Sequence, residues 1–130
     1  MAALRVVMDT NVLVSALLNK DSKPGKILRM VLDSEVFLII NDLIVSEYDE
    51  VLSRGKLNID AEDRERTIVL IRLLGIYFEP MKGTYRLQDE DDRIFFDTAE
   101  QARAILITGN SKHFPKRDFI LTPAEFLSML

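Results

Sequence analysis

Cysteine is absent from this sequence of 130 residues, and histidine occurs only once. Without cysteine the chain can form neither disulfide bonds nor zinc sites with thiolate ligands, and its composition suits a reducing compartment such as the cytoplasm. A single histidine also argues against a zinc centre with several histidine ligands. These absences exclude the commonest structural metal sites and leave the acidic residues as the main source of chemistry.

Long apolar runs and an excess of basic charge are also missing. The apolar stretch near the N-terminus contains Arg5 and ends at Asp9, so it is too short and too charged for a signal peptide. No run approaches the ~18 apolar residues of a membrane span, so we expect a cytoplasmic protein with no membrane partner. With 17 Lys and Arg against 21 Asp and Glu, the formal net charge is −4. Any contact with nucleic-acid phosphate must therefore be local.

The chain reads as one unit in which strands and helices alternate. It has no internal repeat and no linker rich in Pro, Gly or Ser, so we expect residues 1–130 to form a single domain. Apolar runs and capping residues predict strands at 4–8, 36–40, 76–78, 104–108 and 119–121, and helices ending near 18, at 26–32, 42–54, 60–74, 93–103 and from 123 onward. This order predicts an α/β fold whose central parallel sheet is covered by helices.

Acidic residues stand near the ends of these strands. Asp9 closes the first strand, Glu47 lies on the helix after the second, and Asp92 opens the helix that leads into the fourth. In an open parallel sheet, residues just past the carboxyl ends of strands converge on one crevice. Two carboxylates about 5 Å apart repel by roughly 3 kcal/mol at an effective dielectric of about 20, so a converged trio requires a cation or a raised pKa. The arrangement indicates a metal site.

Helical geometry, at about 100° per residue, indicates which acids face inward. On the helix from 42, Glu47 flanks the apolar arc, whereas Glu50 falls nearly opposite the centre of that arc. On the helix from 93, Asp92 extends the apolar face and Asp97 points away from it. Asp91 is as close to this face as Asp92, so the helix angles do not decide which of these two residues faces inward.

Each acid also has an ordinary structural explanation. Asp9 is in a position where Asp often serves as a turn former or helix cap. Taken alone, Glu47 is more typical of a solvated helix residue than of a ligand, and residues 89–92 are typical of a solvated acidic loop that caps the next helix. The joint placement of these acids is what favours a site.

Four ordered segments carry a family resemblance. The segments VMDTNVLVS (7–15), SEYDEVL (46–52), DDRIFFDTA (91–99) and ITGNSKHF (107–114) resemble the four motifs of PIN-domain ribonucleases. The similarity extends nearly end to end, including TPAEF (122–126), and is greatest to the branch that supplies the toxins of toxin–antitoxin pairs.

The resemblance implies an α/β/α sandwich that cleaves single-stranded RNA with Mg²⁺ or Mn²⁺. It assigns Asp9, Glu47 and Asp92 as the metal-binding, catalytic carboxylates, and these hard ions prefer oxygen ligands. It also implies that water, rather than the ribose 2′-hydroxyl, attacks the phosphodiester, which leaves 5′-phosphate and 3′-hydroxyl ends.

One position departs from the family pattern. Asn110 stands where the family has a fourth acid, and its amide oxygen can bind an ion or a water but adds no negative charge. Asp97 could replace that acid only if its helix is rotated from the orientation expected above. Asn11 and Thr108 either orient the carboxylates or serve as local turn and cap residues.

A short basic patch follows Asn110. We expect Lys112, His113 and Lys116, with the adjacent Arg117, to contact the RNA backbone, although a solvated loop has the same composition. A second group of basic residues with the same ambiguity is Lys20, Lys23, Lys26 and Arg29.

The resemblance also implies partners, namely a second copy in a homodimer and a small antitoxin that covers the acidic crevice. The apolar side chains of Leu127, Met129 and Leu130 are compatible with such contacts. A dehalogenase-type phosphatase would need an acid at Asn11, a receiver domain would need paired acids near the first strand, and no P-loop motif is present. The remaining alternative is a PIN-like protein that binds RNA or a protein partner without cleaving, because Asn110 lacks the fourth charge.

Overall fold

A five-stranded parallel sheet forms the centre of the computed structural model, which describes residues 4–130. The strand order is β3-β2-β1-β4-β5, and each neighbouring pair is parallel. The strands are β1 (Arg5–Met8), β2 (Phe37–Ile40), β3 (Ile76–Tyr77), β4 (Ile105–Ile107) and β5 (Ile120–Leu121). The expected α/β class with a central parallel sheet is thus confirmed, with strand ends one or two residues shorter than expected.

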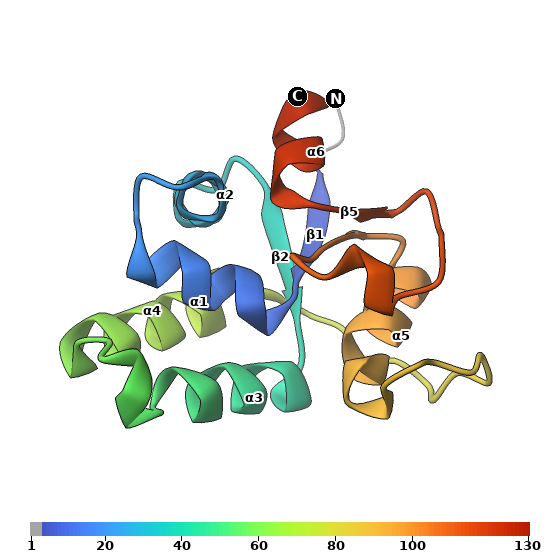
Figure 1. Cartoon of the computed structure of the whole chain (residues 1–130), viewed down its shortest axis with the longest axis horizontal. Coiled ribbons are helices and arrows are strands. Elements are labelled where there is room, and N and C mark those ends of the chain that lie inside the picture. The colour runs from blue at the N-terminus through green and yellow to red at the C-terminus, as the bar shows by residue number, and fades with distance from the viewer. Residues whose placement is uncertain (1–3) are drawn as a thin grey trace.

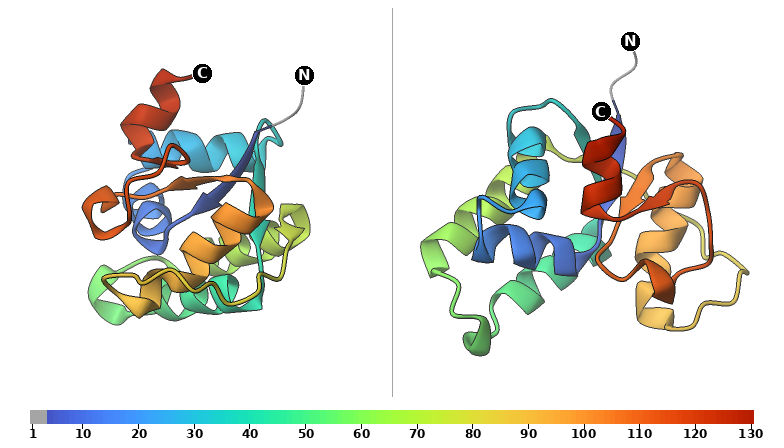
Figure 2. Two further views of the ribbon diagram at one scale, coloured as in Figure 1. Left: turned by 90° about the vertical axis from the view of Figure 1, so that its right-hand side faces the viewer. Right: turned by 45° about the horizontal axis from the view of Figure 1, so that its top comes forward.

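Helices connect the strands and cover the sheet. They are α1 (Thr10–Leu18), α2 (Lys23–Leu32), α3 (Asp42–Leu52), α4 (Ala61–Leu74), α5 (Arg93–Ala102) and α6 (Pro123–Ser128), with short 3-10 turns η1 (Gly55–Leu57), η2 (Glu90–Asp92) and η3 (Ser111–His113). The connections from β1 to β2 and from β2 to β3 add strands in one direction along the sheet. The connection from β3 to β4 crosses back to the other side of β1. Right-handed crossovers therefore place α1–α4 on one face and α5 on the other, as Figures 1 and 2 show.

The strand order reverses at β1. The chain passes from β1 to β2 on one side, and β4 pairs with β1 on the other side. In open α/β sheets, this kind of switch point leaves a crevice outside the carboxyl ends of the strands. Asp9 and Thr108 directly follow β1 and β4, so both lie at the crevice.

Capping residues explain where most helices begin. Asn41 caps α3 by accepting a hydrogen bond from the Ile44 amide at 3.0 Å, and Thr122 forms a capping box with Glu125 at the start of α6. The helix α4 begins after Asp60, as the sequence predicts.

The prediction that this helix starts at residue 26 is wrong, because Pro24 and Gly25, which often break helices, lie inside the first turn of α2. The helix begins at Lys23, where the Ser22 hydroxyl accepts a hydrogen bond from the Gly25 amide at 3.1 Å. Pro24 lies in the first turn, where its missing N–H has no partner to lose. A Cβ at Gly25 would lie 2.3 Å from the Lys20 carbonyl oxygen, so glycine permits the close approach of the α1–α2 connection.

The core lies on both faces of the sheet. Apart from the first residue of each strand, the residues of β1, β2 and β4 are buried, and the largest buried side chains are Tyr48, Phe95, Phe96 and Phe126. Strands buried on both faces are typical of parallel sheets covered by helices. In residues 4–130, every helix falls short of the length and apolarity that crossing a bilayer requires.

Candidate active site

Asp9 is fixed at the switch point by hydrogen bonds from both neighbouring elements. Its Oδ1 accepts from the Thr10 amide at 2.8 Å, and its Oδ2 accepts from the Thr108 hydroxyl at 2.7 Å. The Asp9 amide donates to the Ile107 carbonyl at 2.9 Å, so β4 also holds the backbone. Asp9 is only 7% exposed. It therefore caps α1, as one sequence interpretation held, while its carboxylate also borders the crevice.

Thr10 joins Asp9 to Glu47. Its amide binds Asp9, and its hydroxyl donates to Glu47 Oε2. Glu47 therefore faces the crevice and Glu50 is exposed, which confirms both orientations expected from the helix angles. Sequence reasoning missed Thr10, although a hydroxyl residue directly after a candidate ligand at a helix start is a recognisable signal.

Tyr48, the residue after Glu47, connects α3 to the end of β1. It is fully buried, and its hydroxyl donates to the carbonyl of Met8, the last residue of β1. This bond ties α3 to the strand end that carries Asp9, so the two elements that supply Asp9 and Glu47 are held together.

The carboxyl groups of Asp9, Glu47 and Asp92 all have pKa values above their ordinary range. Burial is the main cause for each. Burial, followed by the charge of Asp9, raises the pKa of Asp92 to about 6, and the charge of Glu47 contributes. The charge of Asp9 likewise raises the pKa of Glu47. These mutual effects indicate that the fold brings the three predicted acids within electrostatic reach of one another.

Asp91 and Asp92 differ in exposure. Asp92 is half-buried, whereas Asp91 is exposed and its amide donates to Asp89 Oδ1 at 2.9 Å. The charge of Asp91 still contributes to the raised pKa of Glu47, so both acids border the crevice. Burial favours Asp92 as the inward residue.

These residues suit a divalent cation by their chemistry. Each carboxylate retains oxygen lone pairs beyond those used by Thr10 and Thr108, and carboxylate oxygens are the ligands that Mg²⁺ and Mn²⁺ prefer. A cation would also relieve the repulsion between acids that, after burial, contributes to the raised pKa values of Glu47 and Asp92. Among residues 4–130, however, no three acidic or histidine side chains are already gathered as a closed set of metal ligands. Binding would require the carboxylates to close around the ion.

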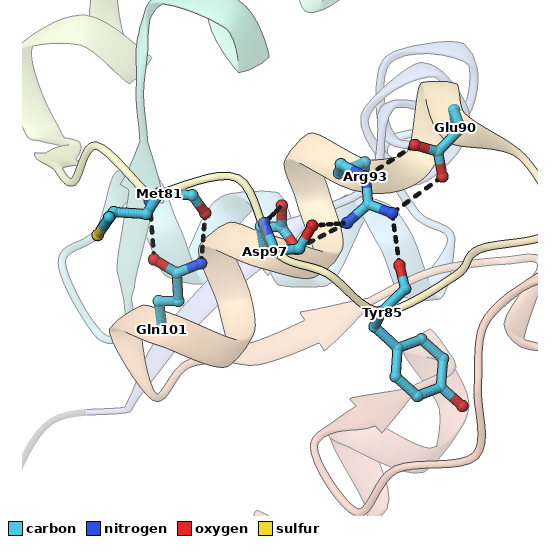
Figure 3. Close-up of polar contacts among 7 residues, drawn as sticks. Met81, Tyr85, Glu90, Arg93, Asp97 and Gln101 are labelled. Carbon is cyan, nitrogen blue, oxygen red and sulfur yellow. Dashed lines mark hydrogen bonds and ion pairs between the residues drawn. The ribbon is translucent and has the colours of Figure 1, made fainter.

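Asp97 lies on the outer face of α5, as the helix angles predict, but this face does not meet solvent. Asp97 is 2% exposed, and its Oδ2 accepts from the Gly83 amide at 2.9 Å. Its Oδ1 lies 3.5 Å from Arg93 Nη1. The helix angles assumed that the outer face of α5 meets solvent, but residues 78–89 cross that face and bury it (Figure 3). These contacts join Asp97 to the loop, and neither reaches Asp9, Glu47 or Asp92.

Arg93 completes the attachment of this loop, which we call the strap (residues 78–89). Its guanidinium donates to the carbonyls of Gly83, at 2.9 Å, and Tyr85, and to Glu90 Oε1 at 2.9 Å (Figure 3). Farther along α5, the Gln101 side chain exchanges two hydrogen bonds with the Met81 backbone. The strap leads directly into η2, so these bonds help to set the position of Asp92.

The polar residues expected around the acids take different places. The Thr108 hydroxyl is buried against Asp9, as expected for a residue that orients a carboxylate. Asn11 Oδ1 accepts from the Gly109 amide at 3.2 Å and so braces the turn after β4. The Asn110 amide donates to Thr108 Oγ1 at 3.0 Å, and Asn110 is exposed. Asn11 and Asn110 line a cavity of about 280 Å³, whose other walls include Pro24 and Pro123.

Lys112, His113 and Lys116 are exposed on the connection between β4 and β5. The positive charge of His113 lowers the pKa of both Asp9 and Asp92, so His113 lies within electrostatic reach of the acids. Lys112, Lys116 and Arg117 line a cavity of about 380 Å³, and the Arg117 guanidinium lies 4.7 Å from the centre of the Tyr85 ring. In the second basic group, Lys20 pairs with Asp63 at 3.7 Å.

Comparison with known proteins agrees with the architecture. The family model described as "PIN domain" matches residues 5–112, which is most of the chain, so the protein belongs to the PIN domain family. Members of this family are generally nucleases and typically use divalent metal ions. The chain is also similar to an uncharacterized protein of Methanocaldococcus jannaschii, with 29% identity over 118 residues that cover 88% of this chain and 76% of that protein.

Proposed function

We propose that this protein is a metal-dependent endoribonuclease that cleaves single-stranded RNA by attack of water on the phosphodiester. The observation that carries the proposal is the electrostatic coupling of Asp9, Glu47 and Asp92 at the switch point, with all three pKa values raised. Coupled carboxylates with raised pKa values are characteristic of functional sites, and family membership makes nuclease chemistry the leading candidate.

The three carboxylates would hold Mg²⁺ or Mn²⁺, which when bound supplies an acidified water and neutralises charge on the phosphoryl oxygens. Thr10 and Thr108 keep two of the carboxylates in fixed orientations through hydrogen bonds to their oxygens. Fixed carboxylates bind an ion with less loss of conformational freedom. Attack by water would leave 5′-phosphate and 3′-hydroxyl ends.

Lys112, His113 and Lys116 would bind the RNA backbone beside the acids. None of Lys112, Lys116 and the adjacent Arg117 forms a salt bridge within residues 4–130, so their charges are available to phosphate. Asn11 and Asn110 would complete the surroundings of the ion, whereas Asp97 would remain bound to the strap through Gly83 and to Arg93. Asn110 is exposed and its amide donates to Thr108, whose hydroxyl binds Asp9, so Asn110 would be placed to hold a water.

We further propose that the protein is the toxin of a toxin–antitoxin pair in the cytoplasm, acting as a homodimer that a small antitoxin inhibits. Met129 and Leu130 are 49% and 59% exposed, and Leu127 packs partly against the core. These exposed apolar side chains are available for protein contacts. Growth arrest on expression, relieved by Asp92→Asn, would support the toxin role, whereas normal growth at high expression would contradict it.

Cleavage of labelled single-stranded RNA by the purified protein tests the enzyme. We expect cleavage with Mg²⁺ or Mn²⁺ that stops on addition of a chelator and in the Asp92→Asn variant. Asp118→Asn is a matched control, because Asp118 is exposed on the connection to β5. Cleavage that survives both the chelator and Asp92→Asn would refute the proposal.

The second candidate function is binding of RNA or a protein partner without cleavage. Asn110 in place of a fourth acid and the absence of a closed set of ligands in the described part of the chain favour this alternative. Calorimetric titration with Mn²⁺ distinguishes the two, because the nuclease requires binding that Asp92→Asn weakens. Asn110→Asp should strengthen Mn²⁺ binding if the site is intact.

A further inference from the structure

A groove between α1 and α3 opens beside the acidic residues and has a volume of about 420 Å³. Figure 1 shows these helices side by side, both leading away from the sheet toward residues 53–60. The groove is lined by Thr10, Asn11, Val14 and Ser15 from α1 and by Val51, Arg54, Lys56 and Leu57 from the end of α3 and η1. Its volume is within the range of small-ligand sites.

The inner end of the groove reaches the proposed active site. Thr10 lines this end, and its hydroxyl donates to Glu47 Oε2. On α3, Val51 follows Glu47 by four residues, so helical geometry puts the two on one side of the helix, and Arg54, which lies between α3 and η1, lines the same groove.

The outer end of the groove carries two positive charges. Lys56 is exposed and forms no salt bridge among residues 4–130. Arg54 pairs with Glu50 at 3.3 Å, but both side chains are largely exposed, and such pairs are weak. Between the two ends, Val14, Val51 and Leu57 are half-buried and give the groove an apolar middle.

We propose that this groove binds one nucleotide of the RNA next to the scissile phosphate, and this assignment rests on the proposed function. The base lies over the apolar side chains, and Arg54 and Lys56 bind the neighbouring phosphate. Arginine and lysine are suited to this role because charge-assisted hydrogen bonds to phosphate are strong. An acidic peptide fits less well, because its charges would meet the carboxylates at the inner end.

Salt-dependent binding of a labelled single-stranded RNA tests the groove. The measurement uses the Asp92→Asn background, which removes cleavage and one repelling charge, and compares it with the same protein carrying Arg54→Gln and Lys56→Gln. Each lost phosphate contact reduces the slope of log K against log salt by about 0.7 for single strands. We therefore expect the slope to fall by about 1.4 and the affinity to fall about tenfold at low salt.

A matched control has Arg66→Gln and Arg5→Gln in the same background. Arg66 pairs with Asp63 at 3.3 Å, just as Arg54 pairs with Glu50, and Arg5 is exposed at the start of β1, the opposite end of that strand from Asp9, so the charge change is identical. The control should keep the original slope. Equal slopes for the groove variant and the control would overturn the proposal.

Ser15→Trp tests the apolar part of the groove, because it fills the space from an exposed position without changing charge. RNA affinity should fall while the salt slope and the Mn²⁺ affinity stay unchanged, which separates a blocked groove from a damaged fold. Unchanged RNA affinity would overturn the assignment of a base to the groove. If wild-type protein cleaves RNA and tolerates all groove changes, the groove assignment fails alone. If it binds RNA with the expected slope change but never cleaves, the groove stands and the nuclease proposal fails.

Discussion

Replacing Asp92 with asparagine should make the metal-free protein more stable at alkaline pH. Burial and the charge of Asp9 raise the pKa of Asp92 from 3.8 to about 6. The folded protein therefore holds a proton that the unfolded chain has already released between about pH 4 and 6. The resulting stability is fully present below pH 4 and is lost as the pH rises through about 6.

The size of this effect follows from the same pKa. A change in pKa from 3.8 to about 6 corresponds to a loss of about 3 kcal/mol in the free energy of unfolding if solvent screening is ignored. Because Asp92 is only half-buried and solvent screens its charge, we expect about half of this, or ~1.5 kcal/mol. For a domain of this length, that difference raises the melting temperature by about 5 °C.

Thermal unfolding followed by circular dichroism measures this difference. In chelator, Asp92→Asn and wild-type protein should melt together at about pH 3, where Asp92 is largely neutral in both the folded and the unfolded state, and the variant should melt higher at pH 8. Excess Mg²⁺ should reverse the order at pH 8, since an ion at 100 times its dissociation constant adds about 2.7 kcal/mol to the protein that binds it. Asp118→Asn is the control for charge alone. The reasoning is refuted if the variant gains nothing at pH 8 in chelator, or if Mg²⁺ stabilises both proteins equally.

Three further substitutions test the supports of the site. Thr10→Val removes the hydroxyl that holds Glu47 and should weaken Mn²⁺ binding about 10- to 100-fold in calorimetry, with Thr10→Ser retaining most of the affinity. Thr108→Val removes a buried hydrogen bond to a carboxylate and should lower the free energy of unfolding by about 1.5–3 kcal/mol in urea, a loss that unchanged midpoints would contradict. Gly83→Ala places a Cβ 2.6 Å from Asp97 Oδ1 and should cost about 1–3 kcal/mol in the same assay, whereas Gly55→Ala, with no atom within 4 Å, should cost less.

Features that depend on local sequence were predicted well. The β1 strand and Asp9 were recognisable because a short apolar run is followed by a helix-capping residue. The inward direction of Glu47 followed from the apolar arc of α3, whose residues Val45 and Tyr48 are buried in the core. Hydrophobic periodicity and helix capping depend on residues that are close together in the chain, so both can be recognised in a single sequence.

Features that depend on distant segments were missed. The burial of Asp97 was missed because nothing near it in the sequence shows that the strap, 14 residues upstream at Gly83, covers the outer face of α5. The hydrogen bond from Thr10 to Glu47 spans 37 residues and exists only after α1 and α3 have packed. A helix angle identifies two faces, but only the tertiary structure shows what covers each.

The strap also limits how this protein can be altered. Arg93 donates hydrogen bonds to the backbone carbonyls of Gly83 and Tyr85. Asp97, on the same helix, accepts a hydrogen bond from the Gly83 amide. A loop grafted from a relative would therefore need its own matching arginine and aspartate, since a change in its length would shift the start of α5. Surface loops usually tolerate insertion, but this one is expected to exchange between homologues only together with the helix beneath it.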